Sequence, residues 1–413
     1  MSTADAPIVI AGAGIGGLAA ALALSRCGFN VEIFERRSDP DETGAGIQVG
    51  PNGIKVLRAL GVAPDLAAVA HVPDAIVPRL GEDGRALPEL PLGRWIENRH
   101  GAPYWTLRRR DLHRVLRTAI DAAASVKVTT GVGVEGFASG GPGGDVAIAL
   151  SDAQTHTAAL LIAADGQSSR LRAQIVPQHP VGGGTAYSAS RTTIPIDAAG
   201  DNKQARTSVG VWFSPHGHLV HYPVNAGREL NVVLISRRID ETAASRSVLD
   251  NAARDGVIAD LLAVAPSLAA GTVDALRSAT WGRWQMEHVP PLGSWTSAGA
   301  ALLGDAAHPI APFLAQGAVM ALEDAIVLAT ELARARCDVR PLQEGLAAYE
   351  NARRSRVEKV RLQARNNGRI YHMRGNLGRV RNVGMRLAGG PRLMASYDWL
   401  YGWDPPLLDT ASL

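Results

Sequence analysis

The feature that most constrains the fold is a glycine pattern close to the N-terminus, which runs from Gly12 to Gly17 as GAGIGG. An apolar run at 7–11 precedes it and is typical of a short buried strand, and a helical segment at 18–26 follows it. A second strand-like run occupies 31–35. Together these segments make one βαβ unit of about 30 residues, which predicts the start of a parallel sheet.

The three glycines of the GxGxxG spacing have separate roles in such a unit. Gly12 permits a tight turn, Gly14 lets the backbone approach a pyrophosphate, and Gly17 lets helix and strand pack closely. The N-terminus of the helix attracts the phosphate charge, and Glu35 at the end of the second strand can accept hydrogen bonds from a ribose. The pattern therefore predicts a dinucleotide-binding domain, without distinguishing FAD from NAD.

Length and patterning predict a second domain inserted into the first. At 413 residues the chain is longer than one hydrophobic core usually organises. Buried strands at 160–164 and 300–305 and a long helix at 319–336 extend the α/β pattern, whereas 181–277 is dominated by alternating β-type segments. Further expected elements are helices at 110–124 and at about 245–264, strands at 209–213, 219–224 and 230–236, and a loop-rich stretch at 131–144.

Composition argues against several function classes. The 42 Lys and Arg against 39 Asp and Glu give a net charge of only +3, so no nucleic-acid partner is implied, and the basic C-terminal residues fit the solvated face of amphipathic helices. Cys27 and Cys337 stand far apart and outside any metal-ligand spacing. No run is apolar enough to span a bilayer. We expect a cytoplasmic enzyme without a metal site, and a homodimer is compatible with the sequence.

Two later segments resemble signatures of the group A flavoprotein monooxygenases. These are Ala164–Arg172 and Gly304–Pro309, the second followed by Gln316-Gly317 and Glu323-Asp324. Further stretches similar to that family are Gly44–Asn52, Leu107–Leu112 and Trp399–Asp404, so the resemblance extends over nearly the whole chain. Within that family, these stretches are similar to the salicylate, 3-hydroxybenzoate and 6-hydroxynicotinate hydroxylases.

The resemblance implies an α/β fold of the para-hydroxybenzoate hydroxylase type. This fold has a Rossmann-like FAD-binding domain, an inserted β-sheet substrate domain and a C-terminal helical segment. The expected boundaries are 1–75, 100–180 and 278–365 for the FAD-binding domain, 76–99 and 181–277 for the substrate domain, and 366–413 for the C-terminal segment. FAD is the implied cofactor and NADH or NADPH the co-substrate, which docks transiently because no second GxGxxG follows a convincing strand.

The FAD-binding residues expected from the glycine pattern and the resemblance are spread along the chain. Asp305 ends a buried strand, where it can accept a ribityl or ribose hydroxyl, although a simple N-cap is the alternative role. The helix beginning near Gly317 directs N–H groups at a flavin that is anionic when reduced. The full set is Gly12, Gly14, Ile15, Gly17, Glu35, Arg36, Gln48, Val49, Arg109, Asp165, Asp305, Gln316, Gly317 and Ala318.

Three histidines lie close together in the inserted segment, but their spacing argues against a metal site. His218 and His221 differ by an odd number and would point to opposite faces of a strand, and His216 lies in a turn between Pro215 and Gly217. We expect His308 to shape the loop in which it lies and to take no part in catalysis.

His218 and Tyr222 are the catalytic candidates. They share one face of a strand about 13 Å apart, and their HxxxY spacing resembles the active sites of the 3-hydroxybenzoate and 6-hydroxynicotinate enzymes. The resemblance implies that His218 assists deprotonation of a ring hydroxyl while Tyr222 orients the substrate; a packed strand pair without chemistry is the alternative. Pro312 and Phe313 should also line the substrate, at positions where those relatives often have a polar side chain.

These features predict an FAD-dependent monooxygenase that hydroxylates a small phenolic or N-heteroaromatic ring, expected to be carboxylated, with or without loss of that carboxylate. NAD(P)H reduces the flavin, dioxygen adds at C4a, and a ring made electron-rich by ionisation attacks the resulting electrophilic hydroperoxide. Two alternatives remain open at this stage: a flavin-dependent oxidase or dehydrogenase of an amine or alcohol, and a non-catalytic flavin-binding module.

Overall fold

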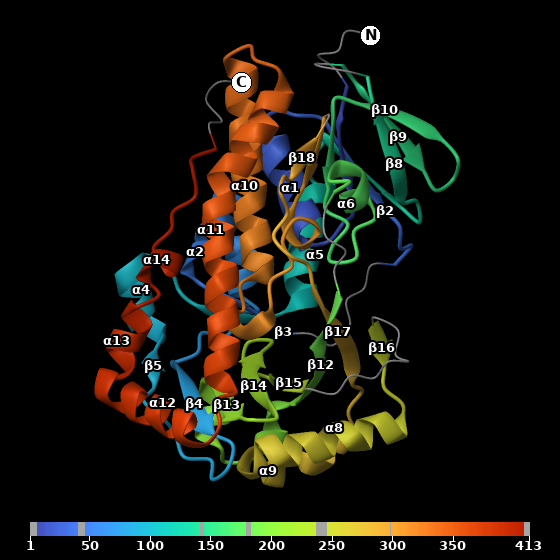
Figure 1. Ribbon diagram of the computed structural model, residues 1–413. Helices are drawn as coiled ribbons and strands as arrows, with labels where there is room; N and C mark the ends of the chain where they lie inside the picture. The colour runs from blue at the N-terminus through green and yellow to red at the C-terminus, as the bar shows by residue number, and fades with distance from the viewer. Residues whose placement is uncertain are drawn as a thin grey trace.

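A six-stranded sheet forms the centre of one half of the molecule in the computed structural model (Figure 1). The structure describes residues 6–39, 46–140, 144–178, 183–236, 246–297 and 299–408. The strand order is β18-β19-β11-β1-β2-β7. The strands are β1 (Ile8–Ala11), β2 (Val31–Glu35), β7 (Val126–Thr130), β11 (Leu160–Ala163), β18 (Thr296–Ser297) and β19 (Ala300–Leu302).

The parallel pairing of this sheet brings three loops together at one edge. β1 pairs in parallel with β11 and with β2, and β11 pairs in parallel with β19. The loops after β1, β11 and β19 therefore leave the same end of the sheet, which is where open α/β sheets bind ligands. Long helices pack beside these strands, namely α1 (Ile15–Arg26), α5 (Arg109–Asp121) and α10 (Gly317–Cys337).

An eight-stranded sheet forms the other half, in the order β16-β17-β12-β15-β14-β13-β4-β5. Its strands are β4 (Ala75–Leu80), β5 (Leu90–Pro91), β12 (Gly183–Pro195), β13 (Val209–Ser214), β14 (Gly217–Val224), β15 (Glu229–Ser236), β16 (Arg246–Val248) and β17 (Gly282–His288). The helices α8 (Asn251–Val264) and α9 (Pro266–Ser278) lie beneath it in Figure 1. Leu219, Val232 and Leu234 pack into their core cluster. Because side chains alternate along a strand, residues 218, 220 and 222 face the opposite way.

The C-terminal part of the chain is helical. α11 (Leu342–Tyr371) runs along the side of the molecule from the six-stranded half to the eight-stranded half (Figure 1). It is followed by α12 (Gly375–Ala388), α13 (Gly390–Ala395) and α14 (Asp398–Tyr401). Within the described ranges, no helix combines the length and the apolar character needed to cross a membrane.

The remaining elements are short. β3 (Gly46–Val49) pairs with β6 (Trp105–Arg108), and β8 (Val134–Ser139), β9 (Val146–Leu150) and β10 (Thr155–Ala158) form a three-stranded sheet. The other helices are α2 (Pro51–Ala59), α3 (Ala63–Ala67), α4 (Gly93–His100), α6 (Leu171–Ile175), α7 (Lys203–Thr207) and the single turns η1 (Ile196–Ala199), η2 (Gly304–Ala306) and η3 (Pro312–Leu314).

The predicted α/β fold with an inserted sheet and a helical C-terminal segment is confirmed, and two local expectations were wrong. The stretch 131–144, expected to be loop-rich, contains the strand β8, and its residues 141–143 lie outside the described ranges. The helix expected from about 245 begins at Asn251, because Asp250 caps it by accepting a hydrogen bond from the Ala253 backbone N–H at 2.8 Å. The domain boundaries stay a prediction; α11 continues across the one expected at 365.

Candidate functional site

The glycine loop after β1 is tightly built on one side and open on the other. Gly12 has φ +105°, and a Cβ there would lie 2.7 Å from the carbonyl oxygen of Ala164. A Cβ on Gly17 would lie 2.0 Å from the carbonyl oxygen of Gly12, so helix and strand touch here. A Cβ on Gly14 would meet nothing within 4 Å. The backbone at Gly14 is therefore accessible, as the approach of a pyrophosphate requires.

Glu35, at the end of β2, stabilises the glycine loop through hydrogen bonds of its carboxylate. Its carboxylate accepts hydrogen bonds from the backbone N–H groups of Ala13 and Arg37, each at 2.9 Å. The His113 ring on α5 reaches the Ala13 carbonyl oxygen at 2.8 Å. Each carboxylate oxygen has lone pairs to spare for a ribose hydroxyl, whereas the side chain of Arg36 is exposed and that of Ile15 is buried.

Arg172 ties together the loops that follow β11 and β19. Its guanidinium donates to the backbone carbonyls of Asp305 and Ala306, at 2.9 and 2.7 Å. In the first of these loops, Oδ2 of Asp165 accepts from the Arg170 N–H at 3.0 Å, while its buried Oδ1 has no partner among the described residues. A buried carboxylate oxygen normally has a donor, so Asp165 fits a cofactor hydroxyl.

A cleft of about 250 Å³ separates the loops of the six-stranded half from the face of the large sheet that carries His218. It brings together seven of the predicted cofactor or catalytic residues. The loop side contributes Gln48, Arg109, Asp305, Gly317 and Ala318, and the sheet side contributes His218 and Tyr222. Gly44 and Ala45, which precede the Gln48 strand, lie outside the described residues.

The N-terminus of α10 opens onto this cleft. Gly317 and Ala318 line it, and a Cβ on Gly317 would have only Asp305 Oδ1 nearby, at 3.8 Å. Ala315 just before the helix adopts φ +52°, a conformation that costs free energy in a residue other than glycine and is common at functional sites. The 21-residue helix thus directs its first N–H groups at the cleft, where they favour negative charge.

Two predicted cofactor residues point away from the cleft. Gln316 is 1% exposed, and its Oε1 accepts a hydrogen bond from Asn52 at 3.1 Å. Val49 is fully buried in the core. Any contact of these two residues with a flavin would therefore come from the backbone.

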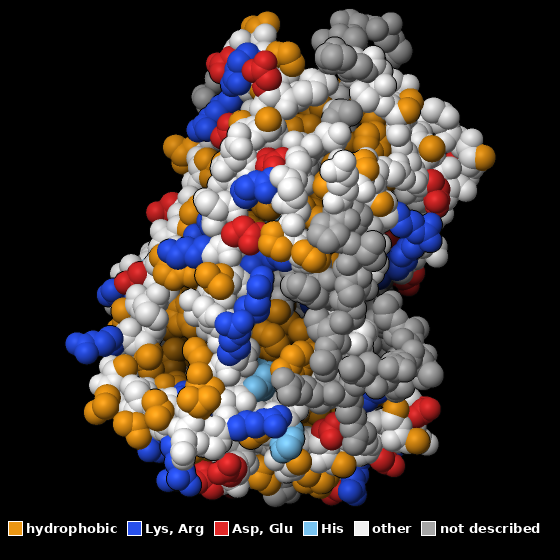
Figure 2. Space-filling model, in the orientation of Figure 1, with side chains coloured by type: hydrophobic (Ala, Val, Ile, Leu, Met, Phe, Trp, Pro, Cys, Tyr) orange, Lys and Arg blue, Asp and Glu red, His pale blue; other side chains and the backbone are white. Residues whose placement is uncertain are grey.

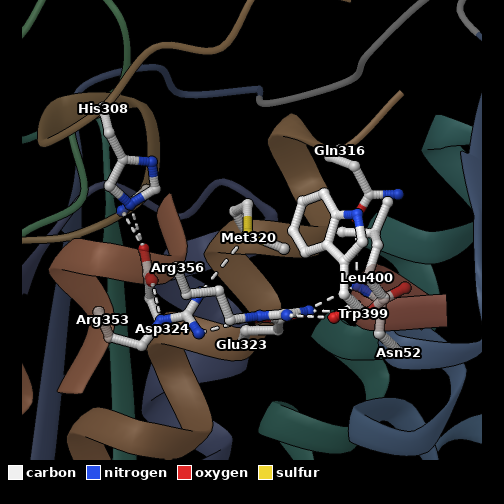
Figure 3. Close-up of polar contacts among 11 residues, drawn as sticks. Asn52, His308, Gln316, Met320, Glu323, Asp324, Arg353, Arg356, Trp399 and Leu400 are labelled. Carbon is white, nitrogen blue, oxygen red and sulfur yellow. Dashed lines mark hydrogen bonds and ion pairs between the residues drawn. The ribbon is translucent and has the colours of Figure 1, made fainter. Parts of the chain in front are cut away.

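Gln316 belongs to a buried network of hydrogen bonds and ion pairs that fixes the loop before α10 onto the helices α10 and α11 (Figure 3). Asn52 Nδ2 donates both to Gln316 and to Glu323 Oε1, the latter at 2.7 Å. Arg356 also pairs with Glu323, at 2.6 Å, and donates to the Leu400 carbonyl at 3.0 Å. The network therefore connects the loop before α10 with the C-terminal helix α14.

The centre of this network is an arginine between two carboxylates. Arg353 donates to Glu323 at 2.7 Å and to Asp324 at 2.8 Å, and all three side chains are at most 1% exposed. His308 Nε2 lies 2.6 Å from Asp324, which also accepts from the Gly304 N–H. Burial by itself would raise the pKa of Asp324, but His308 and Arg353 outweigh it and hold this pKa below its ordinary value. His308 therefore points into the protein interior.

His218 lies on β14 at the border of the cleft, with a histidine partner behind it. Burial, reinforced by neighbouring His372, lowers the pKa of His218 well below its ordinary value, so its imidazole is neutral near pH 7. His218 Nδ1 lies 3.0 Å from His372 Nε2, and His372 Nδ1 lies 3.3 Å from the Tyr187 hydroxyl. The Phe313 ring packs against His218, with 5.2 Å between ring centroids.

Tyr222 shares the cleft face of β14 with His218, as predicted, whereas His221 lies on the opposite face beside Trp212. Burial raises the pKa of the Tyr222 hydroxyl, and both Arg191 and a hydrogen bond to Gln48 oppose that rise. Tyr222 therefore remains a protonated hydrogen-bonding group at neutral pH.

A second cavity, which we call the chamber, adjoins the cleft and has a volume of about 290 Å³. Five residues line both spaces and so mark their junction: Gln48, His218, Val220, Pro312 and Ala315. Phe313 lines the chamber alone. Pro312 and Phe313, for which the sequence predicts substrate contacts, thus lie beside the catalytic candidate His218.

Sequence reasoning missed several residues that the structure brings to this site. Tyr104 donates to Gln48 Oε1 at 2.8 Å, and Asn231 Oδ1 accepts from the Gly46 N–H at 2.7 Å. Arg172 was part of a recognised segment, and its position three residues before the end of α6 gave no indication of its four carbonyl partners. His372 comes from a segment with no recognisable pattern, 154 residues from His218.

Comparison with known proteins agrees with this architecture. The sequence matches the family model described as FAD binding domain over residues 5–364. It is 32% identical over 410 residues to the 3-hydroxybenzoate 6-hydroxylase of Polaromonas naphthalenivorans, covering 97% of each chain. It is 31% identical to the 6-hydroxynicotinate 3-monooxygenase of Pseudomonas fluorescens, covering 86% of this chain and 89% of that one.

A solved structure with the same fold is HpxO of Klebsiella pneumoniae in complex with FAD and uric acid. Its TM-score is 0.79 at 25% identity, covering 98% of this chain and 96% of that chain. Fold, cleft and relatives together define an FAD-dependent aromatic monooxygenase with NAD(P)H as reductant, and the predicted cofactors are confirmed. The chain belongs to the FAD-binding-domain family of flavoprotein monooxygenases.

Proposed function

We propose that the enzyme hydroxylates a phenolic or hydroxylated N-heteroaromatic ring bound at the junction of cleft and chamber, with His218 as the general base. The observation that most supports this proposal is the position of His218. Its neutral, buried imidazole lies at the border of both cavities, and its Nδ1 has His372 as a hydrogen-bond partner. A neutral imidazole is able to accept the proton of a ring hydroxyl, and the resulting phenolate is the electron-rich form that attacks an electrophilic oxygen.

His372 orients this base. If His218 Nδ1–H donates to His372 Nε2, the lone pair of His218 Nε2 is left for the substrate hydroxyl, and His372 Nδ1–H then donates to Tyr187. A histidine base held by a hydrogen bond on its far nitrogen is a recurring catalytic arrangement, because that bond fixes both tautomer and ring orientation. His372 is therefore a positioning residue in this proposal.

Tyr222 and Gln48 position the ring. Gln48 lies between the hydroxyls of Tyr104 and Tyr222 and lines both cavities. These three side chains offer hydrogen bonds to a polar ring substituent, which matches the hydroxy and carboxy groups in the names of the relatives' substrates.

The cleft would hold the flavin. The open backbone at Gly14 suits the pyrophosphate, Glu35 and Asp165 suit ribose and ribityl hydroxyls, and the α10 N-terminus at Gly317 suits the negative charge of the reduced ring. The bound flavin supplies the oxygen activation, once reduced by NAD(P)H. The protein's own part is to bind, orient and deprotonate the substrate and to exclude water from the junction.

The test is oxygen-dependent NADH and NADPH oxidation by the FAD-loaded enzyme across hydroxybenzoates, aminohydroxybenzoates and hydroxypyridines, with product mass determined. We expect one of these rings to stimulate oxidation and to gain one oxygen atom. His218→Asn should lower kcat by about 10²- to 10⁴-fold, the usual contribution of a general base. His216→Asn, on the exposed turn of the same hairpin, is the matched control.

A loss of less than about tenfold in His218→Asn would show that the base lies elsewhere. Flavin reduction by an amine or alcohol without NAD(P)H would contradict the monooxygenase assignment. A cytoplasmic location and a homodimer, both expected from the sequence, remain proposals.

A further inference from the structure

The chamber is walled by the large sheet on one side and by the C-terminal helices on the other. The sheet contributes Ile76, Val209 and Val211, and the helices α11, α12 and α13 contribute Ile370, Met385 and Leu393. Figure 2 shows hydrophobic side chains gathered around a hollow at the lower left of this face, where Figure 1 places α12 and α13. The walls are thus predominantly apolar, with both aliphatic and aromatic side chains.

Among the described residues that line the chamber, none is Asp, Glu, Lys or Arg. Several of its polar groups are already hydrogen-bonded within the protein. The Tyr371 hydroxyl donates to the Phe313 carbonyl at 3.1 Å, and the Tyr397 hydroxyl lies 3.2 Å from Asn367 Oδ1. A charged group entering this space would lose its hydration without gaining a counter-ion, which is strongly unfavourable.

The size of the chamber also exceeds what one small ring requires. Its volume of about 290 Å³ lies just below the range of drug-sized ligand pockets, roughly 300–1,000 Å³, and well above the roughly 150 Å³ of a cavity that holds one benzene ring. This space is additional to the cleft that would hold the flavin. The wall is also closely packed: a Cβ on Gly390 would lie 1.7 Å from the Glu89 carbonyl oxygen, so α13 rests directly on the β5 side of the sheet.

We infer that the chamber binds an uncharged apolar substituent, an alkyl or aryl group of several carbons, carried by the ring whose hydroxyl faces His218. This inference rests on the proposed function and extends it to a substrate class. The junction residues Gln48, Val220 and Pro312 line both cavities, so a ring held beside His218 has direct access to the chamber. The substrate is then larger and more apolar than an unsubstituted hydroxybenzoate.

The experiment measures Kd from perturbation of the bound flavin's absorbance, together with KM, for phenols bearing methyl, propyl or pentyl groups. A second series carries a terminal carboxylate on chains of matched length. We expect Kd to fall about fourfold for each added methylene, equivalent to ~0.8 kcal/mol per buried methylene, until the chamber is full. The carboxylated series should bind at least about tenfold more weakly than the alkyl series.

Met385→Trp would fill part of the chamber from α12, and Leu393→Trp would do so from α13. Each should weaken pentylphenol binding by at least about tenfold more than it weakens the binding of unsubstituted phenol. Leu387→Trp is the matched control, because Leu387 lies on α12 together with Met385 but is 81% exposed. Two independent variants keep the test informative if one of them folds poorly.

A Kd that does not change with chain length, or carboxylated phenols that bind as tightly as alkylphenols, would overturn the inference. Hydroxylation of small phenols without any chain-length effect would leave the proposed function intact and refute the chamber alone. Chain-length-dependent binding without turnover of any phenol would refute the proposed function while supporting the chamber.

Discussion

Replacing Arg353 is the sharpest test of how the C-terminal helices support the flavin site. Arg353 on α11 is 1% exposed and donates to two carboxylates that are fully buried on α10, Glu323 and Asp324. In Arg353→Met, Glu323 keeps Arg356 and Asn52, but Asp324 keeps only His308 and one backbone N–H. The variant therefore leaves two buried carboxylates on consecutive residues with one fewer positive charge.

The expected cost follows from the burial of this ion pair. Breaking a buried pair by removing one partner typically costs 3–5 kcal/mol, because the remaining charge stays desolvated, so we expect Arg353→Met to lower the free energy of unfolding by about 4 kcal/mol. The pKa of Asp324 should rise in the variant, since Arg353 is one of the two groups that hold it down. Affinity for FAD should fall as well, because the network also fixes Gln316 and the loop that precedes α10.

The assay is urea unfolding of the FAD-loaded protein followed by tryptophan fluorescence, with FAD affinity measured separately by titration of the apoprotein. Arg117→Met is the control: Arg117 pairs with Asp121 at 2.8 Å on the exposed face of α5. Such surface pairs contribute about 0–1 kcal/mol. If Arg353→Met were as mild as this control, the carboxylates would be neutral or sufficiently balanced by Arg356, and the reasoning would be refuted.

Three further predictions follow from single contacts. His372→Ala should lower kcat and move the acid limb of the kcat/KM profile to higher pH, because His372 helps to depress the pKa of His218; an unchanged profile would leave His372 a purely structural role. Gly17→Ala should abolish the yellow colour of the purified protein, since its Cβ would lie 2.0 Å from a backbone carbonyl oxygen, whereas Gly384→Ala on α12, with nothing within 4 Å, should remain yellow. Burial lowers the pKa of His221 to about 3, so between pH 6.5 and about 3 only the unfolded chain binds its proton. This histidine should therefore lower the stability by ~1.4 kcal/mol per pH unit on acidification, and His221→Phe should remove that contribution while leaving the contribution of other buried groups such as His218.

The fold was predictable because its signals are local. The glycine loop, the strand that ends at Glu35 and the alternation along β14 each depend on residues within a few positions of one another. The same alternation correctly separated His218 from His221. The helix expected from near 245 begins later for the same local reason: the N-cap Asp250 defines its start, and residues 246–248 before it form a short strand.

The immediate surroundings of the reacting atoms depend instead on contacts that no local pattern encodes. His372 reaches His218 only because the 30-residue helix α11 carries the chain from the six-stranded half to the far sheet before it ends. Met385 enters the chamber from a helix whose other apolar side chains, such as Leu377 and Leu387, are exposed, so periodicity alone could not identify it as a lining residue.

The same geometry explains why the type of reaction and the choice of substrate depend on different parts of this chain. The loops that would hold the flavin come from the strand ends of the six-stranded half, and the chain as a whole is similar to hydroxylases with different ring substrates. The chamber is built largely from β4, β13 and the helices after residue 341, which contribute little to the cleft. Substitutions such as one at Met385 can therefore alter which ring is accepted without disturbing Gly14, Asp165 or Asp305. Chemistry and specificity are thus supported by different elements that meet only at the junction beside His218.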